Sequence, residues 1–284
     1  MAKVSHILTT DDHRRDAAGL RYVYPVVSRR AGGVSVGINL NTNNACNWRC
    51  IYCQVPDLMR GDAPPADLPL LRKELSDFLI EAQEGTFMHD WVPQDARRIV
   101  DVAVSGNGEP TSAREFAEIV DLIAQVLEER GLLRRVVLRL ITNGSRVTRA
   151  TVVEGLQRMA QCNGEVWFKL DAGSPDVIKR INSVSLSART VARNLRRCAE
   201  LCPTWVQTCA FAWNHRIPLK EDLDAYLQIL RDAGVKKLQG VHLYGLARPS
   251  MQPEASELRR LSAAELEELA PRIRALGLTV HVSP

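Results

Sequence analysis

The chain has 284 residues, 45% of them hydrophobic, 25% charged and 5% aromatic, and 37 Lys and Arg against 33 Asp and Glu give a net charge of +4. This composition predicts a globular protein with an adequate core and excludes disordered, collagen-like and coiled-coil chains. No apolar run approaches the ~20 residues of a membrane-spanning helix, and residues 1–15 carry charges where a signal peptide would be apolar. We therefore expect a cytoplasmic protein that does not enter membranes.

Short β-rich segments alternate with helical segments along the chain. The predicted strands cover residues 34–40, 99–105, 136–142, 165–171, 204–212 and 238–246. Apolar residues at helical spacing predict helices at 68–84, 114–130, 149–161, 187–201 and 219–233, followed by a helix at 263–276 and a strand at 279–282. Repeated strand–helix units indicate a parallel sheet.

The six strand–helix units fit either an open doubly wound sheet or a barrel. No strand leads into the G-x-G-x-x-G turn of a dinucleotide-binding sheet, which favours the barrel. Polar residues recur two positions apart on three later strands, so each pair shares one face, either inside a barrel lumen or in solvent at the strand ends. These pairs are Lys169 with Asp171, Gln207 with Cys209, and His242 with Tyr244. We predict an α/β fold, a partial (β/α)6 TIM-like barrel of parallel strands at residues 34–250, with an N-terminal arm at 1–33 and a C-terminal helix and strand extension at 251–284.

Seven cysteines in a reducing compartment indicate metal binding, a reactive thiol or core packing rather than disulfides. Three of them, Cys46, Cys50 and Cys53, form a C-x3-C-x2-C pattern directly after the first predicted strand. Thiolates this close in sequence can bind one soft metal centre from a single loop. A structural zinc needs a fourth ligand, and the nearest histidines are 33 or more residues away. The pattern therefore favours a four-iron cluster with one iron lacking a protein ligand, while zinc binding and plain core packing remain alternatives.

The cysteine pattern, with Tyr52 directly before the third cysteine, resembles the signature of radical S-adenosylmethionine (SAM) enzymes. The resemblance implies that Cys46, Cys50 and Cys53 hold a [4Fe-4S] cluster whose open iron binds the amino and carboxylate groups of SAM. An electron from a low-potential donor of the flavodoxin or ferredoxin type then cleaves SAM, usually to methionine and a 5′-deoxyadenosyl radical that abstracts a hydrogen atom. A non-catalytic iron–sulfur or zinc-binding protein is the alternative.

Further motifs follow predicted strands at positions where this superfamily binds SAM. Residues 105–111 resemble a Gly-Gly-Glu-Pro element that binds the SAM amino group, with Asn107 in place of its first glycine and Glu109 as the carboxylate that suits an ammonium group. Asp171 is expected to accept hydrogen bonds from the ribose and Lys169 to pair with the methionyl carboxylate; a purely structural Lys–Asp pair is the alternative. The predicted SAM-binding residues are Tyr52, Gly106, Asn107, Gly108, Glu109, Asn143, Lys169, Asp171 and Gln207.

An ordered set of segments between residues 24 and 250 narrows the resemblance to the wyosine-synthetase-like branch of the superfamily. These segments are residues 26–30, 37–39, 52–54, 105–111, 141–145, 169–173, 180–182 and 207–208. Members of that branch build a tricyclic base on a tRNA from pyruvate, with a second cluster whose cysteines precede the radical SAM motif. This chain has no cysteine before Cys46 and only a small net charge. A small-molecule or peptide substrate is therefore favoured over a tRNA.

A tRNA substrate remains the alternative, because arginines near the N-terminus offer phosphate contacts. These are Arg14, Arg15, Arg21, Arg29 and Arg30. Other arginines, Arg134, Arg135 and Arg139, begin the third predicted strand and are expected at the barrel end opposite the active-site loops.

The lumen and rim of the predicted barrel supply the remaining candidates. Cys209, Tyr244 and His242 are the candidate catalytic residues, and Gln207 and Arg248 are further candidates for handling substrate. The other cysteines, Cys162, Cys198 and Cys202, are expected to pack in the core, with a second metal site as the alternative. We expect a monomer.

Overall fold

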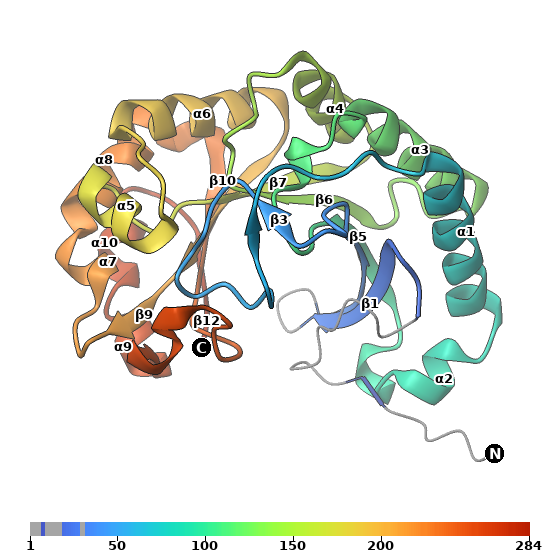
Figure 1. Ribbon diagram of the computed structural model, residues 1–284, viewed down its shortest axis with the longest axis horizontal. Coiled ribbons are helices and arrows are strands. Elements are labelled where there is room, and N and C mark those ends of the chain that lie inside the picture. The colour runs from blue at the N-terminus through green and yellow to red at the C-terminus, as the bar shows by residue number, and fades with distance from the viewer. Residues whose placement is uncertain (1–6, 9–18, 29–31) are drawn as a thin grey trace.

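The computed structural model describes residues 7–8, 19–28 and 32–284. Its centre is an eight-stranded sheet in the order β1-β2-β5-β6-β7-β8-β10-β12 that curls into an incomplete barrel (Figure 1). All neighbouring strands are parallel except β1 and β2, which form an antiparallel pair. The predicted partial barrel of parallel strands is confirmed.

The strands of the main sheet agree closely with the predicted ones, except for β1, which lies in the segment predicted to be an N-terminal arm. They are β1 (Val23–Ser28), β2 (Gly33–Ile38), β5 (Ile99–Val104), β6 (Val137–Thr142), β7 (Gly164–Lys169), β8 (Thr204–Cys209), β10 (Leu238–Tyr244) and β12 (Val280–Ser283). Two small sheets pair β3 (Ala45–Cys46) with β4 (Met59–Arg60), and β9 (Phe211–Trp213) with β11 (Leu258–Arg260). The strand predicted at 204–212 is divided, because β8 ends at Cys209 and β9 leaves the barrel to pair with β11.

Helices cover the convex face of the sheet (Figure 1). The long ones are α1 (Leu68–Glu84), α3 (Phe116–Glu129), α4 (Ala150–Gln161), α6 (Ala188–Leu201) and α8 (Leu223–Ala233). The short ones are α2 (Phe87–Trp91), α5 (Pro175–Asn182), α7 (Pro218–Glu221), α9 (Ala263–Glu267) and α10 (Ala270–Arg274). Single 3-10 turns are η1 (Gln94–Ala96), η2 (Pro110–Ser112), η3 (Val235–Lys237) and η4 (Pro253–Glu257).

The helix predicted at 263–276 is wrong as a single element. It is two short helices, α9 and α10, because Pro271 lies in the first turn of α10 and has no N–H with which to continue the preceding helix. The helix predicted at 68–84 is confirmed, and the Asp67 side chain caps it by accepting a hydrogen bond from Leu70 N at 3.0 Å.

Strands from outside the predicted barrel limits join both edges of the sheet. β1 carries Pro25, which an edge strand tolerates because its outer N–H groups have no ladder partner. At the other edge β12 pairs in parallel with β10. Arg14, Arg15, Arg29 and Arg30 of the predicted basic arm lie outside the described residues.

A charged layer crosses the lumen between β5, β6 and β7. Arg139 is the third residue of β6, only 8% exposed, and its guanidinium pairs with Asp101 and with Glu165, the latter at 2.8 Å. It also lies 4.1 Å from the centre of the Trp167 ring. Arg139 is therefore not at the distant end of the barrel, as expected, but inside the lumen, where it forms part of the floor of a cavity.

Candidate active site

A cavity of about 970 Å³ opens above this floor and adjoins a smaller hollow of about 190 Å³. Both edge strands contribute to its lining, β1 through Tyr24 and β12 through Ser283. The residues that line both spaces are Tyr52, Cys53, Val55, Gly106, Asn107, Gly108, Ile141, Gln207 and Tyr244. Residues from the ends of several strands thus enclose one site, as in other barrels of this type.

The cysteines that line the smaller hollow lie on the loop between β3 and β4. Cys46 ends β3, while Cys50 and Cys53 follow in a stretch of turns. The loop backbone is bonded to the end of α5, with Arg49 N donating to Asn182 O at 3.1 Å and Ile51 N to Ile181 O at 2.9 Å. The loop is thereby held against the barrel rim.

Burial keeps the thiols of Cys46 and Cys50 protonated in the absence of metal. It raises the pKa of Cys46 to about 12, and for Cys50 it raises the pKa to about 11 against the opposing charge of Lys169. Within the described part of the chain no three His, Cys, Asp or Glu side chains are grouped as a metal ion would require. Metal binding therefore requires the thiols to lose their protons and turn toward the hollow that all three line.

The set of donors fits a cluster with one open iron. Cys46, Cys50 and Cys53 line the same hollow, and the other described residues that line it include no histidine and no cysteine. Three soft sulfur donors are too few for a structural zinc site and are suited to iron–sulfur ligation.

The turn after β5 packs tightly against the cysteine loop. A Cβ atom on Gly108 would lie 2.0 Å from Ala45 O, so only glycine fits beside the residue before Cys46. Asn107, at the position where the resembled element has its first glycine, donates its backbone N–H to Asn39 Oδ1 at 3.0 Å and its side-chain amide to Asn44 Oδ1 at 2.7 Å. The replacement thus adds a bridge to the loop segment that precedes the cysteines.

Glu109 is a buried carboxylate, 2% exposed, in the wall of the smaller hollow. One oxygen accepts from Thr111 N at 3.1 Å, from the Thr111 hydroxyl at 2.5 Å and from the Thr142 hydroxyl at 2.6 Å. The other accepts from Asn143 N at 2.6 Å, which leaves it further acceptor capacity. Burial raises the pKa of Glu109 despite these hydrogen bonds, so a cation beside it would be favourable.

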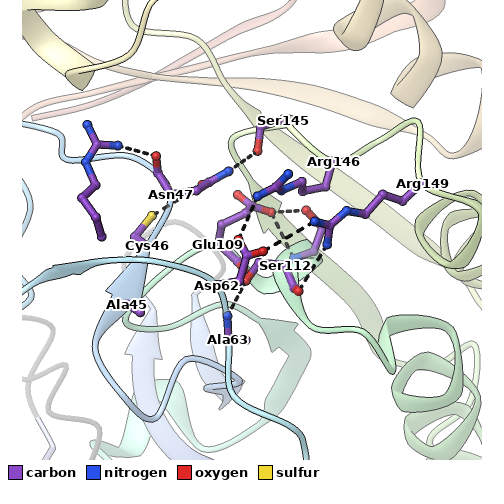
Figure 2. A network of polar contacts seen from close by, with 12 residues as sticks. Ala45, Cys46, Asn47, Asp62, Ala63, Glu109, Ser112, Ser145, Arg146 and Arg149 are labelled. Carbon is purple, nitrogen blue, oxygen red and sulfur yellow. Dashed lines mark hydrogen bonds and ion pairs between the residues drawn. The ribbon is translucent and has the colours of Figure 1, made fainter.

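A polar network ties the cysteine loop to the turn after β6 (Figure 2). The Asn47 side chain donates to Ser145 Oγ at 2.7 Å and accepts from Asn143 Nδ2 at 2.9 Å. Beside it, Arg146 pairs with Asp62 at 2.9 Å. The residue after Cys46 and the strand end that carries Asn143 are therefore held together.

Asp171 has no exposed side-chain surface and is not among the residues that line either space. Its carboxylate accepts from Tyr52 Oη at 2.7 Å, from Asn182 Nδ2 at 3.0 Å and from Cys209 N at 3.1 Å. Lys169 Nζ lies 3.0 Å from it and also contacts the Tyr52 hydroxyl. Tyr52 and Lys169, both predicted to bind SAM, line the smaller hollow. Asp171, also predicted to bind SAM, does not line it but contacts both of these side chains.

Asn182 is a site residue to which sequence reasoning gave no role. Its amide donates to Asp171 and, at 3.3 Å, to Cys50 Sγ, so it links the buried pair to the cysteine loop. The only sequence signal was its place in the 180–182 segment that resembles the family.

β8 and β10 bring other candidates to the cavity. Gln207 lines both spaces, is 6% exposed, and its Oε1 atom is buried without a hydrogen-bond partner. Cys209 lies opposite Tyr244 in the strand register, and burial raises the pKa of its thiol although Tyr244 hydrogen-bonds to it. Arg248 lines the larger cavity.

His242 lies away from the cavity lining. Its ring packs between Trp167 and Trp205, with centroid distances of 4.5 and 4.6 Å, and stacks on His281 at 5.4 Å. His242 is two residues from Tyr244 on β10, so its side chain faces the lumen as expected. It lies within this aromatic layer and does not line the cavity.

The remaining cysteines pack in the core. Cys162, Cys198 and Cys202 are all buried, and Cys202 Sγ contacts Gly164 O at 3.5 Å. Among the described residues, no helix is both long enough and apolar enough to span a membrane.

Relatives among curated proteins match about half of the chain. A UPF0026 protein (slr1464) of Synechocystis sp. is 28% identical over 167 residues, which cover 56% of this chain and 52% of that protein. The GTPase Obg of Brachyspira hyodysenteriae is 27% identical over 158 residues, 56% of this chain and 20% of that protein. The matched region thus spans about half of the first relative's length and less of the second.

Solved structures share the fold at low sequence identity. TYW1 with a lysine–pyruvate adduct has a TM-score of 0.56 at 13% identity, covering 93% of this chain and 78% of that one. Streptococcus suis SuiB bound to S-adenosylmethionine has a TM-score of 0.54 at 11% identity, covering 89% and 47%.

The model of the Radical SAM superfamily matches residues 40–212, more than half of the chain. That range includes the cysteine loop, the turn at Gly108 and Glu109, and the strand ends that carry Asn143, Lys169 and Gln207. The chain belongs to the radical SAM superfamily, whose cofactors are a [4Fe-4S] cluster and SAM.

Proposed function

We propose that this enzyme reductively cleaves SAM and starts radical chemistry on a small-molecule or peptide substrate. The supporting observation is the large cavity that adjoins the cysteine hollow and shares with it Gln207, whose Oε1 atom is a buried, unsatisfied acceptor. A volume of about 970 Å³ is at the upper end of small-molecule sites. It provides room for SAM together with a compact substrate group.

The chain's own residues divide into those that bind and those that support. Cys46, Cys50 and Cys53 would hold the cluster, whose chemistry is to deliver one electron to SAM. Glu109, with acceptor capacity left on one oxygen, suits the SAM ammonium group. Burial, the largest single effect, lowers the pKa of Lys169, but Asp171 together with Cys50, Tyr244 and Cys209 raises it above its ordinary value, so Lys169 suits the methionyl carboxylate.

The other predicted contacts belong to the same proposal. Tyr52, Asn143 and Gln207 would contact SAM through the walls they form, and the tight turn at 106–108 would meet it with its backbone. Asp171 is better suited to positioning Tyr52 and Lys169 than to binding ribose, since its carboxylate is enclosed by four donors.

Cys209 and Tyr244 are the candidate groups for handling a substrate radical. Both line the larger cavity, and their side chains are neighbours across the β8–β10 pair. The Cys209 thiol would donate one hydrogen atom to a substrate radical, and one electron from the low-potential donor plus one proton would restore the thiol. His242 would stabilise the lumen rather than react, because aromatic rings surround it.

Anaerobic reconstitution tests the first part of this proposal. Wild-type protein should bind about four irons per chain and, with dithionite and SAM, release 5′-deoxyadenosine. Cys50→Ala should bind little iron, whereas Cys162→Ala, which removes a packing thiol, should bind iron as wild type. One zinc and no iron in the wild type would refute the proposal.

The substrate class requires a comparison in cells. A deletion strain should show altered small metabolites or peptides by mass spectrometry and an unchanged set of tRNA nucleosides. A modified nucleoside that disappears on deletion and returns on complementation would instead establish the tRNA alternative.

A further inference from the structure

The segment after β10, residues 248–254, lies along the cysteine loop although nearly 200 residues separate the two in sequence. It falls outside the matched family region, which ends at residue 212. Met251 N donates to Cys53 O at 2.8 Å, and the Gln252 side chain donates to Val55 O at 3.2 Å. In return the Gln54 side chain donates to Arg248 O at 3.2 Å. Each segment therefore donates hydrogen bonds to the other.

Ser250 is at the centre of these contacts and is only 7% exposed. Its hydroxyl lies 2.7 Å from Ile51 O and 3.2 Å from Cys53 O, and it accepts from Gln252 N at 3.0 Å. Loss of the hydroxyl would leave the Ile51 carbonyl and the Gln252 N–H without this partner in a buried place, which is costly. The Ser250 side chain therefore contacts the backbone on both sides of Tyr52.

An ion pair fixes the other end of the segment. Arg49, directly before Cys50, donates to Glu254 through both terminal nitrogens, at 2.9 and 2.7 Å. The two side chains are 34% and 20% exposed, and the two-pronged geometry favours one orientation of the arginine. The hydrogen bonds from Arg49 also lower the pKa of Glu254.

The cysteine loop needs such external support because its own regular structure is slight. β3 has two residues, and residues 47–58 form turns and irregular backbone. Ordering backbone of this kind costs roughly 1–2 kcal/mol per residue. The segment 248–254 also reaches the larger cavity, because its first residue, Arg248, lines that cavity.

We propose that residues 248–254 form a strap that holds the cysteine loop in the conformation from which it binds the cluster, with Ser250 and Glu254 as positioning residues. The proposal rests on the cluster that the family uses and is independent of the substrate. Neither residue touches the reacting atoms, so each acts through the loop carbonyls or through Arg49.

The test compares iron retention in full-length, reconstituted protein. Ser250→Ala should lose iron to a ferrous chelator about tenfold faster than wild type, and Glu254→Gln about threefold faster, because that pair is partly exposed. The reduced cluster of Ser250→Ala should also give a broader electron paramagnetic resonance signal after SAM is added, since its ligand loop samples more than one conformation.

Two controls separate the strap from general destabilisation. Ser256→Ala removes an exposed hydroxyl from the neighbouring η4 turn. Thr204→Val removes a fully buried hydroxyl that donates to Cys202 O at 2.8 Å, at the start of β8. Both should retain iron and the wild-type signal, even though Thr204→Val lowers the thermal midpoint. If Ser250→Ala loses iron no faster than Thr204→Val and its signal is unchanged, the strap has no positioning role.

Discussion

Replacing Asp171 with asparagine should destabilise the protein by leaving the Lys169 ammonium group without its buried partner. The substitution keeps the shape of the side chain but removes the charge that faces Lys169 Nζ at 3.0 Å. It also turns one acceptor into a donor at a site where Tyr52, Asn182 and the Cys209 N–H all donate. No rotation of the amide satisfies all of these donors.

The structure sets the size of this effect. Removing one member of a buried ion pair costs about 3–5 kcal/mol. Because the Lys169 side chain keeps 18% of its surface exposed, we expect a value near the lower end, about 3 kcal/mol. In a chain of this size that corresponds to a fall of roughly 6–12 °C in thermal midpoint.

The dependence on pH adds a second signature. In the wild type burial lowers the pKa of Lys169, but Asp171 and the neighbouring groups together raise it above its ordinary value, so the pair stabilises the fold from neutral pH up to the ordinary lysine value. In Asp171→Asn the largest raising effect is lost while burial, the largest single effect, remains, so the pKa of Lys169 should fall below its ordinary value. The unfolded state then binds more protons, so the deficit should shrink as the pH rises from about 7 to about 10.

Thermal unfolding of the cluster-free protein, with a thiol reductant present, measures the effect. Asp176→Asn, the same change at an exposed position on α5, is the matched control and should leave the midpoint unchanged. The double variant Lys169→Met with Asp171→Asn should recover part of the loss, because no buried charge remains. A loss in Asp171→Asn below about 1 kcal/mol, or no recovery in the double variant, would refute the reasoning.

Three further substitutions test the walls of the site. Gly108→Ala should weaken SAM binding at least about tenfold in equilibrium dialysis, because the new Cβ would lie 2.0 Å from Ala45 O and the loop must move; unchanged affinity would contradict the close packing. Glu109→Gln should weaken SAM binding by about 10–100-fold through loss of a charge-assisted hydrogen bond, measured by calorimetry, and wild-type affinity would remove Glu109 from the ammonium site. Gln207→Met should raise the thermal midpoint, since an unsatisfied buried acceptor costs about 1–3 kcal/mol, and a lower midpoint would show that Oε1 has a structural partner.

The sequence by itself determined the local features of this protein. The spacing of Cys46, Cys50 and Cys53, the glycine turn before Glu109 and the alternation of strands and helices all depend on residues close together in the chain. Periods of two and 3.6 residues and ligands within one loop are physical constraints of short range. They were sufficient to predict the partial barrel, which is confirmed, and to identify the superfamily and its cofactors.

The tertiary structure decided which candidate side chains face the cavity and what supports them. Asp171 and His242 are each two residues from a neighbour that lines a cavity, and this spacing predicts that they face it too. The Asp171 carboxylate is instead enclosed by hydrogen-bond donors, and the His242 ring is enclosed by aromatic rings. The strap at 248–254 and the hairpin strand β1 gave no local signal of their role. Their contacts join residues that the curling of the sheet brings together from distant parts of the chain, and no short-range pattern records which partner a residue will meet there.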